Sequence, residues 1–485
     1  MTAYERLRAL CDAEENIWYW GNYQEGDGSR LMGVFCAIGV VCGRQTMIIA
    51  NDNTQSAGSW VARAPEKIVH AQKAALRLGI PVIYLVECAG LFLPTQEKTF
   101  AGEMGAGRIF ETQAELGKSG VLQLAAVFGD CIAGGGYMPL LCDKIVMTER
   151  ASLCIGGTAI HSHAKGQSEE MLGGPQTHVH QSGCVDCRVA DDKAALEKIR
   201  EWMALMPTPA LGYYRMGESM DSPWNVEDLD HLIPVDLARP LDICEILARL
   251  TDAGQFQILH DGAGSEITAA LALIDGLPVV FVASAGAVLY RDGITKMRMV
   301  AAAARDDGIP MIWLQDVAGF DVGPEAEREG LLGHGAMLLR ELSDDSNSCP
   351  PSLTVILRKA SGAGYYAMKG APFHPAWVVA TAVSRLEVMQ PQVLAGVVYD
   401  SKMNRLGDSP KDLEIRAKLE DDKQELLERQ ILNGQALSAA KRGDVDDIVP
   451  LCQLRKLCIS FVRCAYQSTN KPHKPHRLWS LLATL

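Results

Sequence analysis

The chain has 485 residues, a length that predicts two domains rather than one hydrophobic core. Hydrophobic residues make up 48% and charged residues 22% of the chain, which is typical of a well-packed soluble protein. The formal net charge of −13 argues against a nucleic-acid partner, because binding a phosphate backbone requires a concentrated basic surface.

The cysteines and the hydropathy of the chain indicate which kind of cellular compartment to expect. Fourteen cysteines are scattered through apolar runs, and the first twenty residues (MTAYERLRALCDAEENIWYW) lack the apolar region of a signal peptide. We therefore expect reduced, buried thiols in a cytoplasmic protein. No apolar run approaches the ~20 residues that a membrane-spanning helix needs.

In chain order, the pattern of the first half starts with an amphipathic stretch at 69–78 (VHAQKAALRL). An apolar run follows at 79–90 (GIPVIYLVECAG). A second apolar run, 121–137 (VLQLAAVFGDCIAGGGY), ends in three glycines. The pattern predicts a helix, a strand, and then a strand followed by a glycine loop. Continuous apolar strands between amphipathic helices predict a sheet covered on both faces.

The second half repeats this pattern, with an amphipathic stretch at 297–307, an apolar run at 308–319 (GIPMIWLQDVAG) and another at 353–365 (LTVILRKASGAGY). The two GIP segments lie 229 residues apart, and the motifs GGGY and GAGY align at an offset of 228. So long a repeat predicts two related α/β domains and not a solenoid. The prolines of HLIPVDLARP mark the boundary, which predicts domains 1–235 and 236–485.

The glycine loops suggest chemistry. Small residues allow a ligand to approach the backbone, and a helix that starts there leaves N–H donors unpaired. Two such N–H groups aimed at one point form an oxyanion hole, which stabilises the charge that develops on a thioester oxygen. The alternative is that these glycines only allow close packing of helix and strand. Their occurrence in both halves favours the first interpretation. In that case Gly135→Val in an open loop would abolish turnover and largely spare folding.

Longer motifs carry a resemblance. They are, in the first half, LMGVFCAIGVVCGRQTMIIAND (31–52), IPVIYLVECAGLFLPTQEKTF (80–100), GAGRIFETQAELGKSGVLQLAAVFGDCIAGGGYMP (105–139) and SLCIGG (152–157), and in the second half RPLDICEILARLTD (239–252), IPMIWLQDVAGFDVGPEAE (309–327) and SLTVILRKASGAGYYAM (352–368). The first set resembles the N-domain of biotin-dependent acyl-CoA carboxylase carboxyltransferases. The second resembles especially the carboxyltransferase (α) subunit of glutaconyl-CoA decarboxylase, while PFHPAWVVATAVSRLEVMQPQ (372–392) is more similar to the carboxylases.

The resemblance implies two crotonase-like domains built from repeated strand-strand-helix units. It implies that the N–H groups of Gly134 and Gly135 hold the acyl-CoA thioester oxygen as an enolate, and that those of Ala363 and Gly364 hold the ureido oxygen of biotin. It also implies a substrate-binding role for three further residues, Gly156, Gly157 and Tyr366; Tyr366 could equally fill the core, and Tyr137 is expected to be structural. No side-chain base is then required.

The resemblance further implies that the protein moves a carboxyl group between an acyl-CoA (glutaconyl-CoA or a similar short-chain thioester) and biotin on a carrier protein. A biotin carboxylase or a membrane decarboxylase subunit would be a further partner. The two holes meet across a dimer interface in this family, so at least a homodimer is expected. Lys369 stands in AMK, which imitates a biotin-attachment motif, but it follows a glycine loop and is expected to be a solvated or CoA-side lysine.

Other residues have simpler interpretations. The stretch 161–187 holds His161, His163, His178, His180, Cys184 and Cys187, but its irregular spacing favours a loop over a metal site. Asp316 is expected to position a loop by hydrogen bonds. A crotonase-type hydratase or isomerase without biotin would need paired glutamates, and Glu87 has no glutamate partner. A non-catalytic scaffold is the other alternative, against which the intact glycine loops argue.

Overall fold

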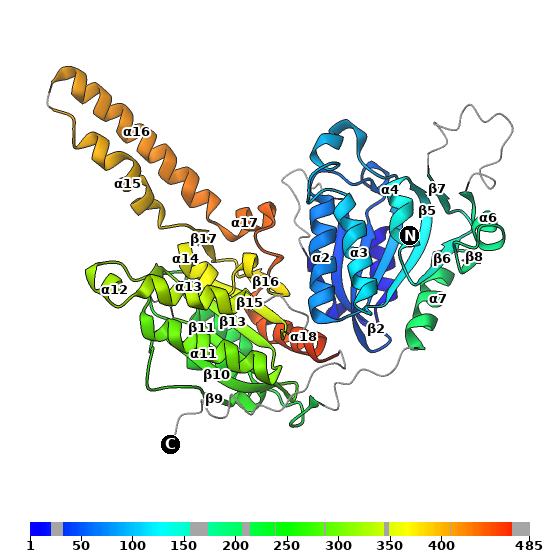
Figure 1. The fold of residues 1–485 in the computed structure, drawn as a ribbon, viewed down its shortest axis with the longest axis horizontal. Coiled ribbons are helices and arrows are strands. Elements are labelled where there is room, and N and C mark those ends of the chain that lie inside the picture. Colours follow the sequence, from blue (N-terminus) through cyan, green and yellow to red (C-terminus); the bar gives the residue numbers. More distant parts are fainter. Residues whose placement is uncertain are drawn as a thin grey trace. The chain divides into compact units, whose positions relative to one another are not determined.

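The computed structural model describes residues 1–20, 33–155, 173–205, 214–237, 239–285, 288–343, 349–407 and 409–467. Among the described residues, the chain forms two compact units, one of Met1–Tyr213 with 463–467 and the other of Tyr214–Val462. Each unit has its own sheet and core, as expected for two α/β domains (Figure 1). The assignment of 1–235 to the acyl-CoA side and 236–485 to the biotin side stays a prediction.

Unit 1 is an eight-stranded sheet in the order β1-β2-β3-β4-β5-β6-β8, with β7 paired to β5. The first two pairings are antiparallel and the rest are parallel. Its strands are β1 (Trp18–Trp20), β2 (Val34–Val41), β3 (Arg44–Asn51), β4 (Val82–Cys88), β5 (Gln123–Ile132), β6 (Lys144–Thr148), β7 (Ser152–Cys154) and β8 (Cys187–Val189). Its helices are α1 (Ala3–Leu10), α2 (Ala64–Leu78), α3 (Gly107–Lys118), α4 (Gly134–Leu140), α6 (Pro175–His180) and α7 (Asp192–Ala204).

Helices cover the sheet of unit 1 as the apolar strands predict. Leu7 of α1 and Ile199 of α7 are fully buried and join a core with alternate residues of the strands, such as Ile83 and Leu124. Helices α2 and α3 lie side by side over the sheet (Figure 1). The predicted helix at 69–78 is the C-terminal part of a longer one, α2, which begins at Ala64.

Unit 2 repeats this sheet strand for strand, in the order β9-β10-β11-β13-β15-β16-β18, with β17 paired to β15. A separate two-stranded sheet pairs β12 with β14. The strands are β9 (Phe256–Ile258), β10 (Ile267–Ile274), β11 (Leu277–Ser284), β12 (Val288–Leu289), β13 (Met311–Val317), β14 (Gly319–Phe320), β15 (Ser352–Ser361), β16 (Trp377–Ala380), β17 (Arg385–Glu387) and β18 (Asp447–Ile448).

The helices of unit 2 include a hairpin that the repeat does not predict. Helices α15 and α16 form it and extend beyond the sheet of their unit (Figure 1). The helices are α9 (Leu229–Leu232), α10 (Ile243–Leu250), α11 (Arg291–Asp307), α12 (Pro324–Arg328), α13 (Leu331–Leu342), α14 (Gly362–Ala367), α15 (Pro391–Met403), α16 (Pro410–Asn433), α17 (Ala436–Arg442) and α18 (Leu454–Gln467), the last of which contains the boundary between the units.

Candidate active site

The first glycine loop joins β5 to the short helix α4. Ala133 precedes the helix with φ 51° and ψ −118°, a conformation that L-residues rarely adopt. Its N–H donates to the Cys154 carbonyl at 2.9 Å, and its own carbonyl accepts from the Gly136 N–H at 3.0 Å. The N–H groups of Gly134 and Gly135 belong to the first turn of α4, where the helix itself offers no acceptor.

Gly135 is buried against the end of β4. A Cβ atom at this position would lie 2.3 Å from the Cys88 carbonyl oxygen, and one at Gly134 would lie 2.9 Å from the ring of Trp60. The expectation that Gly135→Val would spare folding is therefore wrong, because the backbone of β4 fills the space that a side chain needs. The packing interpretation therefore holds for Gly135, whose close contact with β4 fixes the start of α4, whereas the oxyanion hole stays a prediction.

The thiol of Cys88 lies beside this loop without being a nucleophile. It is fully buried, and burial raises its pKa to about 12. A thiol becomes reactive when its pKa falls toward neutrality. The raised pKa therefore argues against a nucleophilic role for Cys88.

The second glycine loop joins β15 to α14. Gly362 has φ 52°, Ala363 is exposed, and Gly364 is buried, with space for a Cβ closed by Val317 at 2.7 Å and the Gly319 Cα at 3.1 Å. Tyr366 is 44% exposed, which argues against its filling the core.

The structure corrects the alignment of the two loops by one residue. Strands β4 and β13, strands β5 and β15, and the irregularity in each pairing all lie 229 residues apart. At this offset Ala133 corresponds to Gly362, both with positive φ, and Gly135 corresponds to Gly364, both packed on the preceding strand end. Tyr137 then corresponds to Tyr366, and both side chains are exposed, so the expectation that Tyr137 is a structural residue is not supported.

The strained residue of the first loop gives a stability prediction. We expect Ala133→Gly to raise the free energy of unfolding by about 1 kcal/mol, because glycine tolerates the conformation that costs alanine roughly 1–3 kcal/mol. Ala363→Gly is the matched control: the φ of Ala363 is not positive, so glycine should lower stability there by up to ~1 kcal/mol. Urea denaturation measures both, and a change in the same direction for the two variants would contradict the strain.

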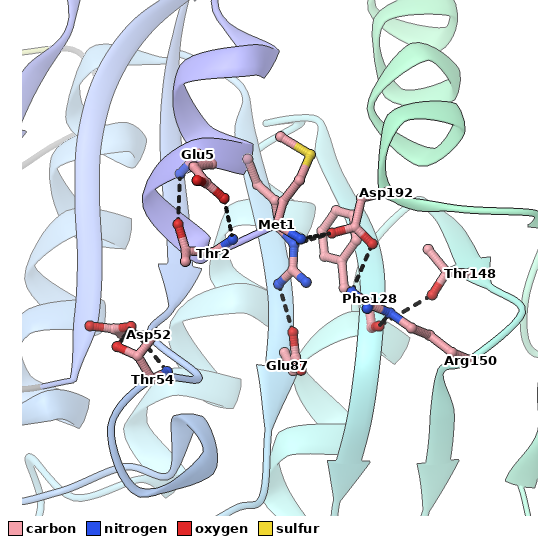
Figure 2. A network of polar contacts seen from close by, with 11 residues as sticks. Met1, Thr2, Glu5, Asp52, Thr54, Glu87, Phe128, Thr148, Arg150 and Asp192 are labelled. Carbon is pink, nitrogen blue, oxygen red and sulfur yellow. Dashed lines mark hydrogen bonds and ion pairs between the residues drawn. The ribbon is translucent and has the colours of Figure 1, made fainter.

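An acidic residue near the end of each central strand is neutralised by arginine. Glu87 of β4 accepts from Arg6 Nη1 at 2.7 Å, while Arg6 Nε donates to Asp192 at 2.8 Å. Arg150 donates to the other oxygen of Asp192 at 2.8 Å (Figure 2). Burial alone would raise the pKa of Asp192, but the Arg6 hydrogen bond and charge outweigh it and the pKa is lowered.

Asp316 is the residue of β13 that corresponds to Glu87. It pairs with Arg358 at 2.5 Å, both side chains being fully buried, and it accepts from the Lys359 N–H at 3.0 Å. Arg358 also donates to the carbonyls of Asp236 at 2.9 Å and Arg239 at 2.7 Å. The expected positioning role of Asp316 is confirmed, and it is exerted through Arg358.

Comparison with known proteins decides the family. The profile of the carboxyl transferase domain matches residues 22–479. This chain belongs to the carboxyl transferase domain family. Its relatives include the uncharacterised carboxylase YngE of Bacillus subtilis, 33% identical over 92% of this chain and 87% of the relative.

Two further relatives have named substrates. The biotin-dependent 3-methylcrotonyl-coenzyme A carboxylase beta1 subunit of Mycobacterium tuberculosis is 32% identical over 77% of this chain and 70% of its own. The glutaconyl-CoA decarboxylase subunit alpha of Acidaminococcus fermentans is 27% identical over 96% and 86%. The beta subunit of P. aeruginosa geranyl-CoA carboxylase has the same fold, with a TM-score of 0.85, 23% identity and coverage of 98% and 88%. The predicted biotin-dependent carboxyltransferase family and the crotonase-like α/β fold class are thereby confirmed.

The prediction that Lys369 is a solvated lysine is wrong. Lys369 is buried, and its Nζ donates to the Leu342 carbonyl at 2.8 Å. The ammonium group therefore donates to a backbone carbonyl in a buried position.

The other residues singled out in the sequence are two glycines and the His- and Cys-containing stretch at 161–187. Gly156, Gly157, His161 and His163 lie outside the described residues. His178 uses one ring nitrogen at 2.8 Å from the Leu153 carbonyl and the other at 3.0 Å from Ser182. In the part of the carboxyl transferase domain that the structure describes, no three His, Cys, Asp or Glu side chains are grouped as metal ligands. Within that part, too, no helix combines the length and apolar character needed to cross a bilayer.

Proposed function

We propose that this protein is the carboxyltransferase subunit that moves a carboxyl group between a short-chain acyl-CoA and biotin borne on a carrier protein. In this proposal the N–H groups of Gly134 and Gly135 hold the thioester oxygen, and those of Ala363 and Gly364 hold the ureido oxygen of biotin. The observation that carries it is the pair of glycine loops, which sit at equivalent positions of two equivalent sheets.

The chemistry of the two loops supports binding of the thioester oxygen at the first loop and of the ureido oxygen at the second. Each places first-turn N–H donors beside small residues, so that an oxygen atom can approach the backbone. Fixed donors of this kind stabilise an enolate without reorganising during the reaction. Biotin, when bound, supplies the mobile carboxyl group, and the exposed, small Ala363 leaves room for its ureido ring.

Two other functions are less well supported. A hydratase or isomerase without biotin needs paired glutamates near one hole, and Glu87 forms an ion pair with Arg6 of α1 instead. A scaffold without activity has no need of Ala133, whose strained backbone is typical of functional sites.

The relatives suggest which acyl group is used and in which direction the carboxyl group moves. We propose glutaconyl-CoA or a similar short-chain thioester, such as 3-methylcrotonyl-CoA, with Gly156, Gly157 and Tyr366 on the substrate side. Carboxylation would require a biotin carboxylase as a partner, and decarboxylation a membrane decarboxylase subunit. The biotin would belong to the carrier, since Lys369 is buried.

The test is a carboxyl-transfer assay on the purified full chain. Free biotin is supplied with a panel of carboxylated acyl-CoA thioesters, and loss of the carboxylated thioester is followed by mass spectrometry. We expect biotin-dependent turnover of at least one thioester. Absence of both acyl-CoA binding and turnover would favour the scaffold, and hydration or isomerisation without biotin would favour the crotonase-type enzyme.

Assembly gives a further prediction. If one hole acts on each reactant and the two must meet across a subunit interface, the active species should be at least a homodimer. Size-exclusion chromatography with light scattering at assay concentrations measures the mass against the 52.6 kDa of one chain. A fully active 52.6 kDa species would contradict the shared site.

A further inference from the structure

Unit 2 contains a cavity of about 330 Å³ where β17 meets the base of the α15–α16 hairpin. Val388, Met389 and Leu394 contribute to an apolar wall, and Glu387, Gln430 and Asn433 add polar groups. Apolar walls with a few polar groups are typical of small-molecule sites, and this volume lies at the small end of their range.

The cavity shares a segment of chain with the second glycine loop. Strand β17 pairs with the end of β15 so that Glu387 lies opposite Ser361, the residue before the loop. A Cβ at Gly362 would lie 2.8 Å from the Val388 carbonyl oxygen. Two residues that line the cavity, Glu387 and Val388, therefore lie beside the start of the loop where the proposed function puts the ureido ring of biotin.

Glu387 is the unusual group in this cavity. Its side chain is half-buried, and among the described residues none donates a hydrogen bond to its carboxylate or pairs with it. Burial raises its pKa, and the charge of Arg385 offsets this only in part. The guanidinium of Arg442, which also lines the cavity, donates to Asp444 at 2.8 Å and to the Asn433 carbonyl at 2.9 Å. An acceptor is thus left available to a ligand.

We propose that this cavity holds the amide-bearing arm through which biotin is joined to its carrier, with Glu387 accepting a hydrogen bond from the amide N–H of the arm. The inference rests on the proposed function. The arm consists of methylene groups, which match the apolar wall, and of one secondary amide, which matches a carboxylate acceptor and side-chain amides. A carboxylate disfavours an anionic ligand at the same point, so the cavity selects amide-linked biotin over the free acid.

The experiment compares biocytin, in which biotin is amide-linked to lysine, with free biotin. Calorimetric titration of the full chain should show Glu387→Ala weakening biocytin about ten-fold, as expected for a hydrogen bond to a charged group. The same substitution should leave free biotin unchanged or bind it more tightly, because its carboxylate no longer meets Glu387. Glu425→Ala, an exposed glutamate of α16 outside the cavity, is the matched control and should change neither.

Each outcome is decisive if the thermal midpoints show all variants folded. A biocytin Kd within two-fold of the wild type in Glu387→Ala, or no measurable binding of biocytin to the wild type, overturns the cavity assignment. Loss of CoA affinity in place of biocytin affinity also overturns it and assigns the cavity to the pantetheine arm. Failure of the proposed function is separate: it is absence of carboxyl transfer by the wild-type protein itself.

Discussion

Replacing Asp316 by Asn is expected to lower the free energy of unfolding by about 3–5 kcal/mol, because it leaves the charge of Arg358 buried without a counter-ion. Both side chains are completely inaccessible to solvent. Native domains are stable by only about 5–15 kcal/mol, so unit 2 should lose a large fraction of its stability. Urea denaturation followed by circular dichroism measures the loss.

Two further variants test the cause. Asp316→Asn combined with Arg358→Met removes both charges and should cost less than the sum of the single substitutions, since no uncompensated charge remains. Glu325→Gln breaks a comparable pair with Arg328 in α12, where the side chains are 73% and 71% exposed, and should cost less than about 1 kcal/mol. If Asp316→Asn costs no more than Glu325→Gln, the buried pair is not a major contributor to stability.

Much of the fold could be predicted from the sequence because the signal is repeated. The two GIP segments became β4 and β13, and the amphipathic stretches before them became α2 and α11. The loops were harder to align, since the letters GGGY and GAGY match at an offset of 228. Backbone angles decide the offset of 229, and an alanine with positive φ at 133 has no signature in the sequence.

The polar partners could not be predicted, because they come from distant parts of the chain. In unit 1, Arg6 reaches Glu87 from the first helix, α1. In unit 2, Arg358 pairs with Asp316 from the neighbouring strand, β15. At the position that corresponds to Arg358, unit 1 has Gly129, against which the Glu87 side chain packs. The two halves therefore keep the same charge pair with different sequence elements. Glu387 was missed for a similar reason, since only the cavity around it distinguishes it from a surface glutamate.

Ala363→Pro should lower the turnover number for carboxyl transfer by at least ~10²–10³-fold and leave the fold intact. Proline replaces the N–H by a ring carbon, which removes one donor of the proposed hole and occupies the space into which it pointed. Ala363 is the second residue of α14, where the helix offers no acceptor to that N–H, and proline is tolerated in the first turn. Gly362 before it accepts the restriction that proline imposes on its neighbour, because glycine has the widest backbone freedom.

The controls separate loss of the N–H from other damage. Ala363→Ser keeps the N–H and should stay within a few-fold of wild-type turnover. Gly136→Ala in the first loop should also be tolerated, because its Cβ would lie 3.5 Å from its nearest neighbour, the Cys131 carbonyl oxygen, and its N–H already donates to Ala133. Acyl-CoA affinity should not change in Ala363→Pro, since the second loop is proposed to face biotin. Near-normal turnover in a folded Ala363→Pro protein would show that this N–H does not hold the reacting oxygen, whereas a matching fall in thermal midpoint would return the second loop to a packing role.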